Sequence, residues 1–167
     1  GGGERGSPPP GTTDHEVIVI LDRLRSARDP KDRSDAVAHL QRLGKVDPAR
    51  VGRLAVPLVV DLLRARRLGQ LDEGTAQGLL ELLRALLAHP APGAGREVLL
   101  LLLKDPGNVD ALLDMAEGTE TFTTVATLQV MQAALEAGPG EMEGVLQGGG
   151  SQQGMVRLVA CLSDERE

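Results

Sequence analysis

Aromatic residues and cysteine are almost absent from this chain of 167 residues, and each absence excludes a class of structure. Phe122 is the only aromatic residue, since neither Trp nor Tyr occurs. A core made of Leu, Val and Ala favours closely packed helices over strands, in which more Ile, Thr and aromatic residues would be expected. Cys161 is the only cysteine, so an internal disulfide cannot form and a reducing compartment is expected. These absences predict an all-α, cytoplasmic protein.

Excess positive charge and long apolar segments are also missing. The formal net charge of −6 and the isoelectric point near 5.1 remove the basic surface that nucleic-acid binding requires. The longest apolar run, residues 98–103, falls far short of the roughly 20 residues that span a bilayer. The first residues are Gly and Pro and do not resemble a secretory signal peptide. We therefore expect neither nucleic-acid binding nor direct insertion into a membrane.

No pattern of catalytic or metal-ligating residues is present. The three histidines, His15, His39 and His89, are far apart and do not form a His-x-x-x-His or Glu-x-x-His pair. Nucleophile elbows, phosphate-binding loops and calcium-binding loops do not occur. Cys161 is expected to be a buried structural thiol without a histidine nearby. We predict no enzymatic activity, no cofactor, and no catalytic or metal-binding residue. Carboxylates are assigned to helix caps or solvated helix faces: Glu16, Asp22, Asp29, Asp47, Asp61 and Asp114.

What the chain does contain is a repeated helical pattern. The segments 109–115 and 155–161 align with Leu112 on Leu158, which gives a period of 46 residues. HEAT and armadillo repeats have periods of roughly 40 to 47 residues. Looser copies begin at Leu58 and Val19. The pattern predicts an armadillo- or HEAT-like right-handed α-solenoid, whose extended surface serves protein binding.

Local signals divide the chain into elements. Residues 1–12 are rich in Gly and Pro and are predicted to be disordered. Thr13 with Glu16 forms a capping box that opens the first helix. Asp-Pro pairs at 29–30 and 47–48 open the next helices, the first of which is expected to end at Gly44. Pro57 is expected to divide the following segment into helices over 48–55 and 57–67.

Leucines cover nearly the whole circumference of the segment 75–87, which predicts an inner helix sandwiched between neighbours. Breaks at 89–93, Asp105-Pro106, Gly118, Gly138-Pro139 and 148–150 separate the remaining elements. Further helices are expected at about 95–104, 107–116, 121–137, 140–147 and 152–162. Arg64, Arg66 and Arg67 are interpreted as basic residues that complement a helix dipole.

Several strings resemble a known family. The segment 32–43, DRSDAVAHLQRL, is similar to the second helix of the first repeat in the armadillo-like head of the general vesicular transport factor family. These proteins are golgin-type vesicle tethers. The segments 108–115, 125–139 and 154–167 are similar to the next stretch of that head, so the likeness covers about residues 14–167. The family's aromatic residues near Thr121 are reduced to Phe122, and its acidic loop is shortened to residues 90–94.

The resemblance implies that residues 13–167 are a partial armadillo-like head, truncated at the C-terminus. The parent protein would lie peripherally on Golgi membranes and act in ER-to-Golgi and intra-Golgi transport, in vesicle docking and fusion. Its partners would be a Rab GTPase, SNAREs and other Golgi tethering factors, and it would be a homodimer through a coiled coil missing here. The truncated end is expected to leave Met155, Leu158, Val159 and Leu162 uncovered.

Two alternatives remain open, namely a generic armadillo or HEAT adaptor and a helical enzyme or enzyme-regulatory domain. A generic armadillo or HEAT adaptor unrelated to trafficking would share the repeat pattern. A nuclear-import receptor would need ladders of Trp and Asn, whereas this chain has no Trp and only Asn108. A helical enzyme or enzyme-regulatory domain would need a convergent polar pocket, for which the sequence gives no pattern.

Overall fold

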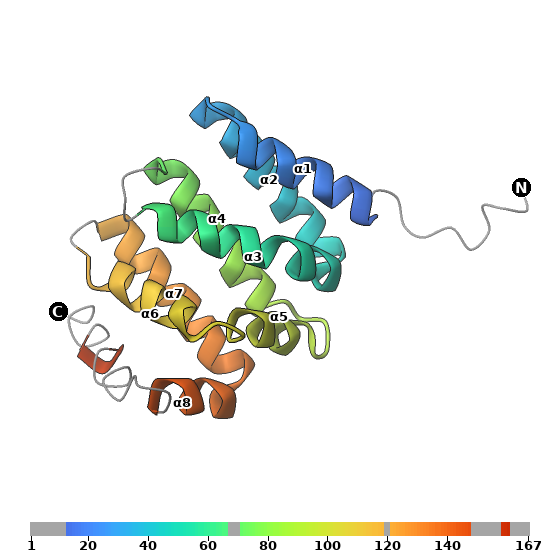
Figure 1. Cartoon of the computed structure of the whole chain (residues 1–167). Coiled ribbons are helices and arrows are strands. Elements are labelled where there is room, and N and C mark those ends of the chain that lie inside the picture. Colours follow the sequence, from blue (N-terminus) through green and yellow to red (C-terminus); the bar gives the residue numbers. More distant parts are fainter. Residues whose placement is uncertain (1–12, 67–70, 119–120, 148–157, 161–167) are drawn as a thin grey trace, which may run out of the picture.

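The computed structural model describes residues 13–66, 71–118, 121–147 and 158–160 (Figure 1). Within these ranges the regular secondary structure is α-helical and no strand occurs, which confirms the all-α class. The helices are α1 (Asp14–Ser26), α2 (Pro30–Val46), α3 (Pro48–Arg66), α4 (Glu73–Leu87), α5 (Ala94–Leu102), α6 (Pro106–Ala116), α7 (Thr121–Ala137) and α8 (Pro139–Gln147). Residues 158–160 are also helical.

Short-range capping decides where the helices begin. The side chains of Asp29, Asp47 and Asp105 each accept a backbone N–H two or three residues ahead, at 2.9–3.2 Å, and a proline follows each of them. A proline at the first helical position loses no hydrogen bond, because that N–H has no partner within the helix. Thr13 Oγ1 accepts the N–H of Glu16 at 3.1 Å. The predicted starts of α1, α2 and α3 are therefore confirmed.

Gly44 does not end α2, which continues to Val46, so the predicted end is wrong. Gly44 is buried against α4, and a Cβ added there would lie 3.1 Å from Leu86 Cδ2. The glycine therefore allows two helices to approach closely. The helix stops two residues later because Asp47 leaves helical geometry and caps α3.

Pro57 does not divide the third segment either, since α3 runs without interruption from Pro48 to Arg66. The prediction of a bent pair of helices is wrong. Pro57 is exposed, so the loss of its N–H affects only the solvent side of the helix. Val56 and Val59, one on each side of it, are buried in the core. Packing on the opposite face holds the two halves of α3 in one helix.

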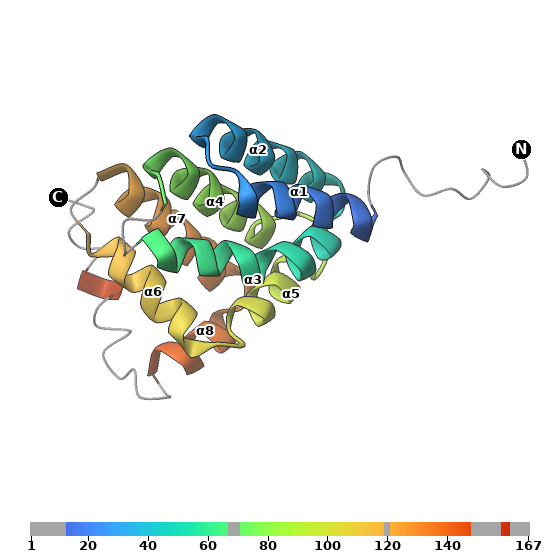
Figure 2. The same ribbon diagram turned by 45° about the horizontal axis from the view of Figure 1, so that its top comes forward.

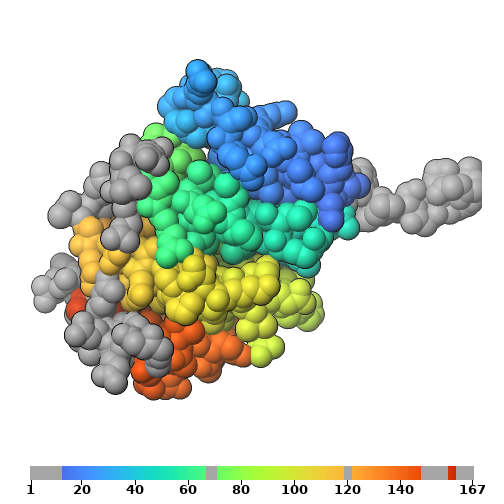
Figure 3. All heavy atoms as spheres, viewed as in Figure 1, coloured from blue at the N-terminus to red at the C-terminus, as the bar shows by residue number. Residues whose placement is uncertain are grey.

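The helices form two layers. The first layer contains α1, α3, α5 and α6, and the second contains α2, α4 and α7. In the first layer α1 contacts α3, and α3 contacts α5 and α6. In the second layer α2 contacts α4, and α4 contacts α7. Figure 2 shows α2 and α4 side by side, with α1 and α3 beside them. In the space-filling view of Figure 3 the bands of α1, α3 and α6 follow one another down one face.

Helix α4 lies at the centre of the molecule. It contacts α2 and α7 within its own layer and α3 and α5 across the layers. Six of its leucines are buried: Leu79, Leu80, Leu82, Leu83, Leu86 and Leu87. Burying a leucine side chain stabilises a fold by about 1.5–3 kcal/mol. The prediction of a sandwiched inner helix over 75–87 is confirmed, and the helix begins two residues earlier, at Glu73.

Two of the four residues expected to be uncovered, Leu158 and Val159, lie within the described residues. Leu158 is 2% exposed and belongs to the main core, so the expectation that it lies uncovered is wrong. Val159 is 54% exposed. Met155, Cys161, Leu162 and the predicted disordered segment 1–12 lie outside the described residues, as does most of the predicted helix 152–162. Among the helices that the structure describes, none is both long and apolar enough to cross a bilayer.

Candidate protein-interaction surfaces

Several ion pairs join segments that lie 39 to 45 residues apart in the sequence. Each pair combines an arginine with a carboxylate 39 to 45 residues away: Arg33 with Asp72, Arg53 with Asp14, Arg64 with Asp105, and Arg96 with Glu141. The distances between charged atoms include 2.8 Å for Arg33–Asp72 and 3.1 Å for Arg64–Asp105. Sequence reasoning missed these pairs, although the recurring separation is a signal that could have revealed them.

Asp72 is the most connected of these carboxylates. It caps α4 by accepting the Thr75 N–H at 2.9 Å and the Thr75 hydroxyl at 2.8 Å, and Arg33 Nε donates to it at 2.9 Å. Burial raises the pKa of Asp72, but the bonds from Thr75 and Arg33 outweigh burial and hold its pKa below the ordinary value. The ion pair between Arg33 of α2 and Asp72 therefore connects the start of α4 to α2.

The basic residues at the end of α3 do more than complement a helix dipole. Arg64 donates to Asp105 at 3.1 Å and to Asn108 at 3.3 Å, which ties α3 to the start of α6. Arg66 donates to Glu73 at 2.7 Å. A backbone N–H at Gly107 and the guanidinium of Arg64 hold the pKa of Asp105 below its usual range. Arg67 lies outside the described residues.

The three histidines occupy three different environments. His39 is partly exposed, and its Nε2 lies 3.9 Å from Glu16 Oε2. His89 Nε2 lies 2.9 Å from the carbonyl of Lys45, and its Nδ1 accepts the N–H of Ala91 at 3.0 Å. His15 is exposed on α1. In the described part of the chain, no three His, Cys, Asp or Glu side chains converge as metal ligands would.

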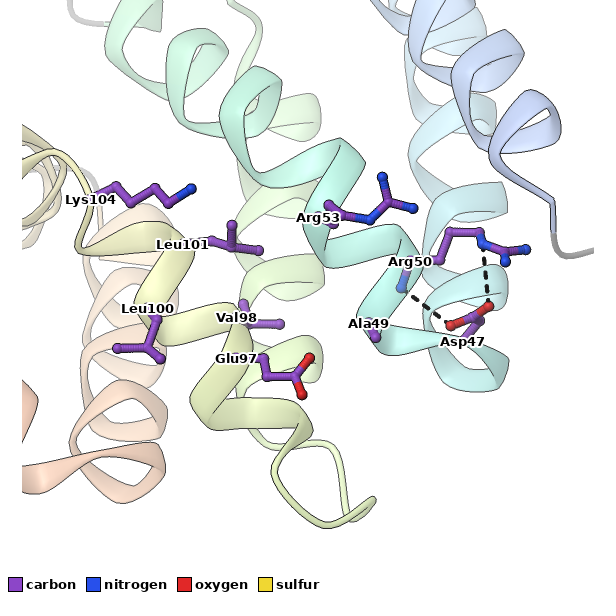
Figure 4. Close-up of a pocket in the computed structure, with 9 residues that line it drawn as sticks. All are labelled: Asp47, Ala49, Arg50, Arg53, Glu97, Val98, Leu100, Leu101 and Lys104. Carbon is purple, nitrogen blue, oxygen red and sulfur yellow. Dashed lines mark hydrogen bonds and ion pairs between the residues drawn. The ribbon is translucent and has the colours of Figure 1, made fainter.

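A groove of about 440 Å³ opens between α3 and α5, and we call it the α3/α5 groove (Figure 4). Its residues are Asp47, Ala49, Arg50, Arg53, Glu97, Val98, Leu100, Leu101 and Lys104. The helices meet closely at its base, where a Cβ added to Gly52 would lie 2.9 Å from Val98 Cγ2. The α5 wall is mainly aliphatic, and Leu100 is 42% exposed although large apolar side chains usually face the core.

The two charges on the α5 side of this groove, Glu97 and Lys104, lie at opposite ends of it, whereas Arg50 and Asp47 form an ion pair on the α3 side. Figure 4 shows Arg53 and Lys104 at one end, on opposite walls, and Glu97 at the other. Arg53 Nη2 and Arg50 Nε lie 2.9 and 3.1 Å from Asp14 Oδ1, so α1 holds both arginines at the α3 wall. The sequence contained one signal of this surface. The six consecutive apolar residues at 98–103 cannot all lie on the single buried face of one short helix. Some of them must therefore be exposed on the surface.

A second depression, of about 490 Å³, lies between α4 and α7, and we call it the α4/α7 groove. Its residues are Glu81, Arg84, Ala88, Gln129, Gln132, Ala133 and Glu136. The hydrogen bond from Arg84 lowers the pKa of Glu81, so the carboxylate is ionised at neutral pH. Amides and an ion pair on packed helices provide donors and acceptors for another polypeptide. They supply no nucleophile with an adjacent base.

No protein-family model matches the chain, and no curated protein sequence matches it.

Proposed function

We propose that the chain is a protein-binding segment of a right-handed α-solenoid that forms part of the head of a vesicle-tethering factor. The proposal is carried by one observation, namely the stacking of helices in two layers with ion pairs between residues 39 to 45 positions apart. Repeats of roughly 40 to 47 residues stack in this way in armadillo and HEAT solenoids. The product of such stacking is an extended surface suited to binding other proteins.

The polar α4/α7 groove is the proposed surface for a protein partner. Gln129 and Gln132 are exposed, and Glu81 with Arg84 forms the opposite side. These side chains recognise another polypeptide through hydrogen bonds and charge. Such polar contacts, once excluded from water, give specificity to a modest interface.

The resemblance to general vesicular transport factors supplies the cellular role. The parent protein would act in ER-to-Golgi and intra-Golgi transport, on the cytoplasmic face of Golgi membranes, with a Rab GTPase, SNAREs and other tethers as partners. The net charge of −6 opposes direct attachment to anionic lipid, because each basic residue near such a surface contributes only about 1 kcal/mol. Recruitment would therefore depend on a protein.

The alternative is an armadillo or HEAT adaptor unrelated to trafficking. The reduced aromatic content near the start of α7 favours this alternative, because tethers of the family carry aromatic residues there. Phe122 alone remains, and it is 76% exposed.

Liposome flotation separates the two proposals. The chain is mixed with liposomes that carry one of a panel of Golgi Rab proteins, loaded with GTP or with GDP, and with bare anionic liposomes. We expect flotation only with a GTP-loaded Rab, and loss of flotation in the variant Gln129→Arg/Gln132→Arg. Gln147→Arg, an exposed substitution on α8, is the matched control. Flotation on bare liposomes would contradict recruitment by a protein, and no flotation with any Rab would favour the adaptor.

A further inference from the structure

Helix α5 and the turn that follows it carry a pattern that complements itself. Leu100 and Leu101 lie at the centre of the groove wall, with Glu97 three residues before the pair and Lys104 three residues after it. Glu97 and Lys104 are both exposed, and no ion pair joins either of them to another described residue. Glu97 lies in the first turn of α5, whereas Lys104 lies in the turn that follows the end of α5 at Leu102.

A two-fold axis through the midpoint between Leu100 and Leu101 exchanges the positions of Glu97 and Lys104. An antiparallel copy of α5 therefore brings opposite charges together at both ends and leucines together at the centre. A two-fold interface requires this kind of self-complementary surface. We propose that a second copy of this chain packs its α5 antiparallel into the α3/α5 groove, and that the first copy does the same in return.

The α3 wall of the groove fits the same occupant. Lys104 forms the basic end, together with Arg53, which also pairs with Asp14, and this end receives Glu97 of the second copy. Glu97 lies toward the other end and receives Lys104 of the second copy, beside Asp47, whose carboxylate is already paired with Arg50. The exposed Leu100 becomes covered by Leu101 of the second copy. The groove thus matches a second copy in both apolar and charged character, and this surface is separate from the α4/α7 groove of the proposed function.

The interface is one helix and one groove from each protomer, which is small for a stable complex. Interfaces below about 1,200 Å² typically belong to weak or transient complexes. We therefore expect a weak dimer, with a Kd of about 1 µM or higher.

Sedimentation velocity of the 167-residue chain over a wide concentration range tests the dimer. We expect a concentration-dependent shift from monomer to dimer in the unmodified chain. Glu97→Lys places lysines opposite each other at both ends, and Lys104→Glu places glutamates opposite each other. Each single variant should raise the dimer Kd by about tenfold or more. Leu100→Glu, at an exposed position, should abolish association by placing two carboxylates beside the axis.

A mixture of the two charge variants provides the decisive measurement. At one end of the mixed interface, the lysine introduced by Glu97→Lys faces the glutamate introduced by Lys104→Glu. At the other end, the unchanged Lys104 of the first variant faces the unchanged Glu97 of the second. The mixture should therefore associate as a heterodimer, whereas each variant alone is weakened.

Overall charge does not explain such an association, because both variants remain net negative. Glu143→Lys mixed with Lys45→Glu is the matched control, because both positions are exposed and lie outside the groove. The control mixture should associate no more strongly than the unmodified chain does.

Three results would overturn the proposal. The first is a chain that remains monomeric at all concentrations, and the second is a dimer that none of the three variants weakens. The third is a mixture of Glu97→Lys and Lys104→Glu that associates no more than either variant does alone. In that third case, binding of an amphipathic helix from another protein would assign the groove to a different partner.

Discussion

At the scale of single residues, aspartates that cap helices also connect helices. Asp105 caps α6 and binds Arg64 of α3, and Asp72 caps α4 and binds Arg33 of α2. Substitution of either aspartate therefore removes two kinds of stabilisation at once. An N-cap is worth about 0.5–2 kcal/mol. A partly buried arginine left without its carboxylate adds to the loss.

Asp72→Ala should lower the free energy of unfolding by about 2 kcal/mol, since it removes the cap and leaves Arg33 without its carboxylate. Asp72→Asn keeps an acceptor for the Thr75 N–H and should cost less than the alanine variant. Urea unfolding at neutral pH measures both values. Equal losses in the two variants would show that the cap contributes nothing beyond the charge.

The contribution of the Asp72 charge should also depend on pH. Its folded pKa lies below the ordinary value of 3.8, so the stabilisation is fully present above that value. It is lost as the pH falls through the folded pKa, because the protonated side chain no longer pairs with Arg33. The difference in stability between the unmodified chain and Asp72→Asn should be constant from pH 7 to about 5 and should shrink below the ordinary aspartate pKa. A difference unchanged in strong acid would contradict this.

Replacing two helical glycines with alanine should change the stability of the fold in opposite directions. Gly144→Ala in α8 should stabilise the fold by about 0.5–1 kcal/mol, because alanine is the better helix former. Apart from its chain neighbours and the backbone of its own helix, no atom lies within 4 Å of the added Cβ. Gly52→Ala should instead destabilise, because its Cβ would lie 2.9 Å from Cγ2 of the stiff Val98 side chain. Thermal unfolding of the two variants gives the comparison, and stabilisation by Gly52→Ala would show that α3 and α5 can separate freely.

At the scale of elements, the unbroken α3 contains a proline that weakens it. A proline in a helix interior costs about 3 kcal/mol relative to alanine, offset by up to about 1 kcal/mol from the stiffer unfolded chain. Pro57→Ala should therefore stabilise the fold by about 2 kcal/mol, since Pro57 is exposed and no packing is lost. Pro30→Ala, at the first position of α2, is the control and should bring no gain. If Pro57→Ala also brought none, the segment would behave as two helices.

The sequence predicts helix starts better than it predicts helix ends and contacts, for a physical reason. The starts at Thr13, Asp29 and Asp47 depend on atoms within three residues, which the sequence displays directly. Gly44 and Pro57 were misinterpreted because their outcome depends on distant packing, such as the contact of Gly44 with Leu86. The two grooves could not be predicted for the same reason, since each depends on which face of one helix meets another.

At the scale of the whole molecule, the contacts run between neighbours in the two layers. The second layer runs from α2 through α4 to α7, and α4 contacts both other members. In stacked repeats the stability is approximately a sum of repeat terms and nearest-neighbour interface terms. A loss of packing at one end should therefore affect the adjacent helices most, whereas a loss in α4 should affect the whole stack.

Hydrogen exchange of backbone amides, followed by mass spectrometry, tests this description. In the unmodified chain α4 should exchange most slowly, because it is packed on four helices, and α1 and α8 should exchange fastest.

Truncating a buried leucine to alanine costs about 2–5 kcal/mol. Leu24→Ala should therefore speed exchange in α1 and α2 and leave α8 unchanged, whereas Leu146→Ala should affect α8 and α7 and leave α1 unchanged. Leu83→Ala in α4 should speed exchange throughout. If all three variants accelerated every helix equally, the molecule would unfold as a single cooperative unit, and the nearest-neighbour behaviour expected of a solenoid would be excluded.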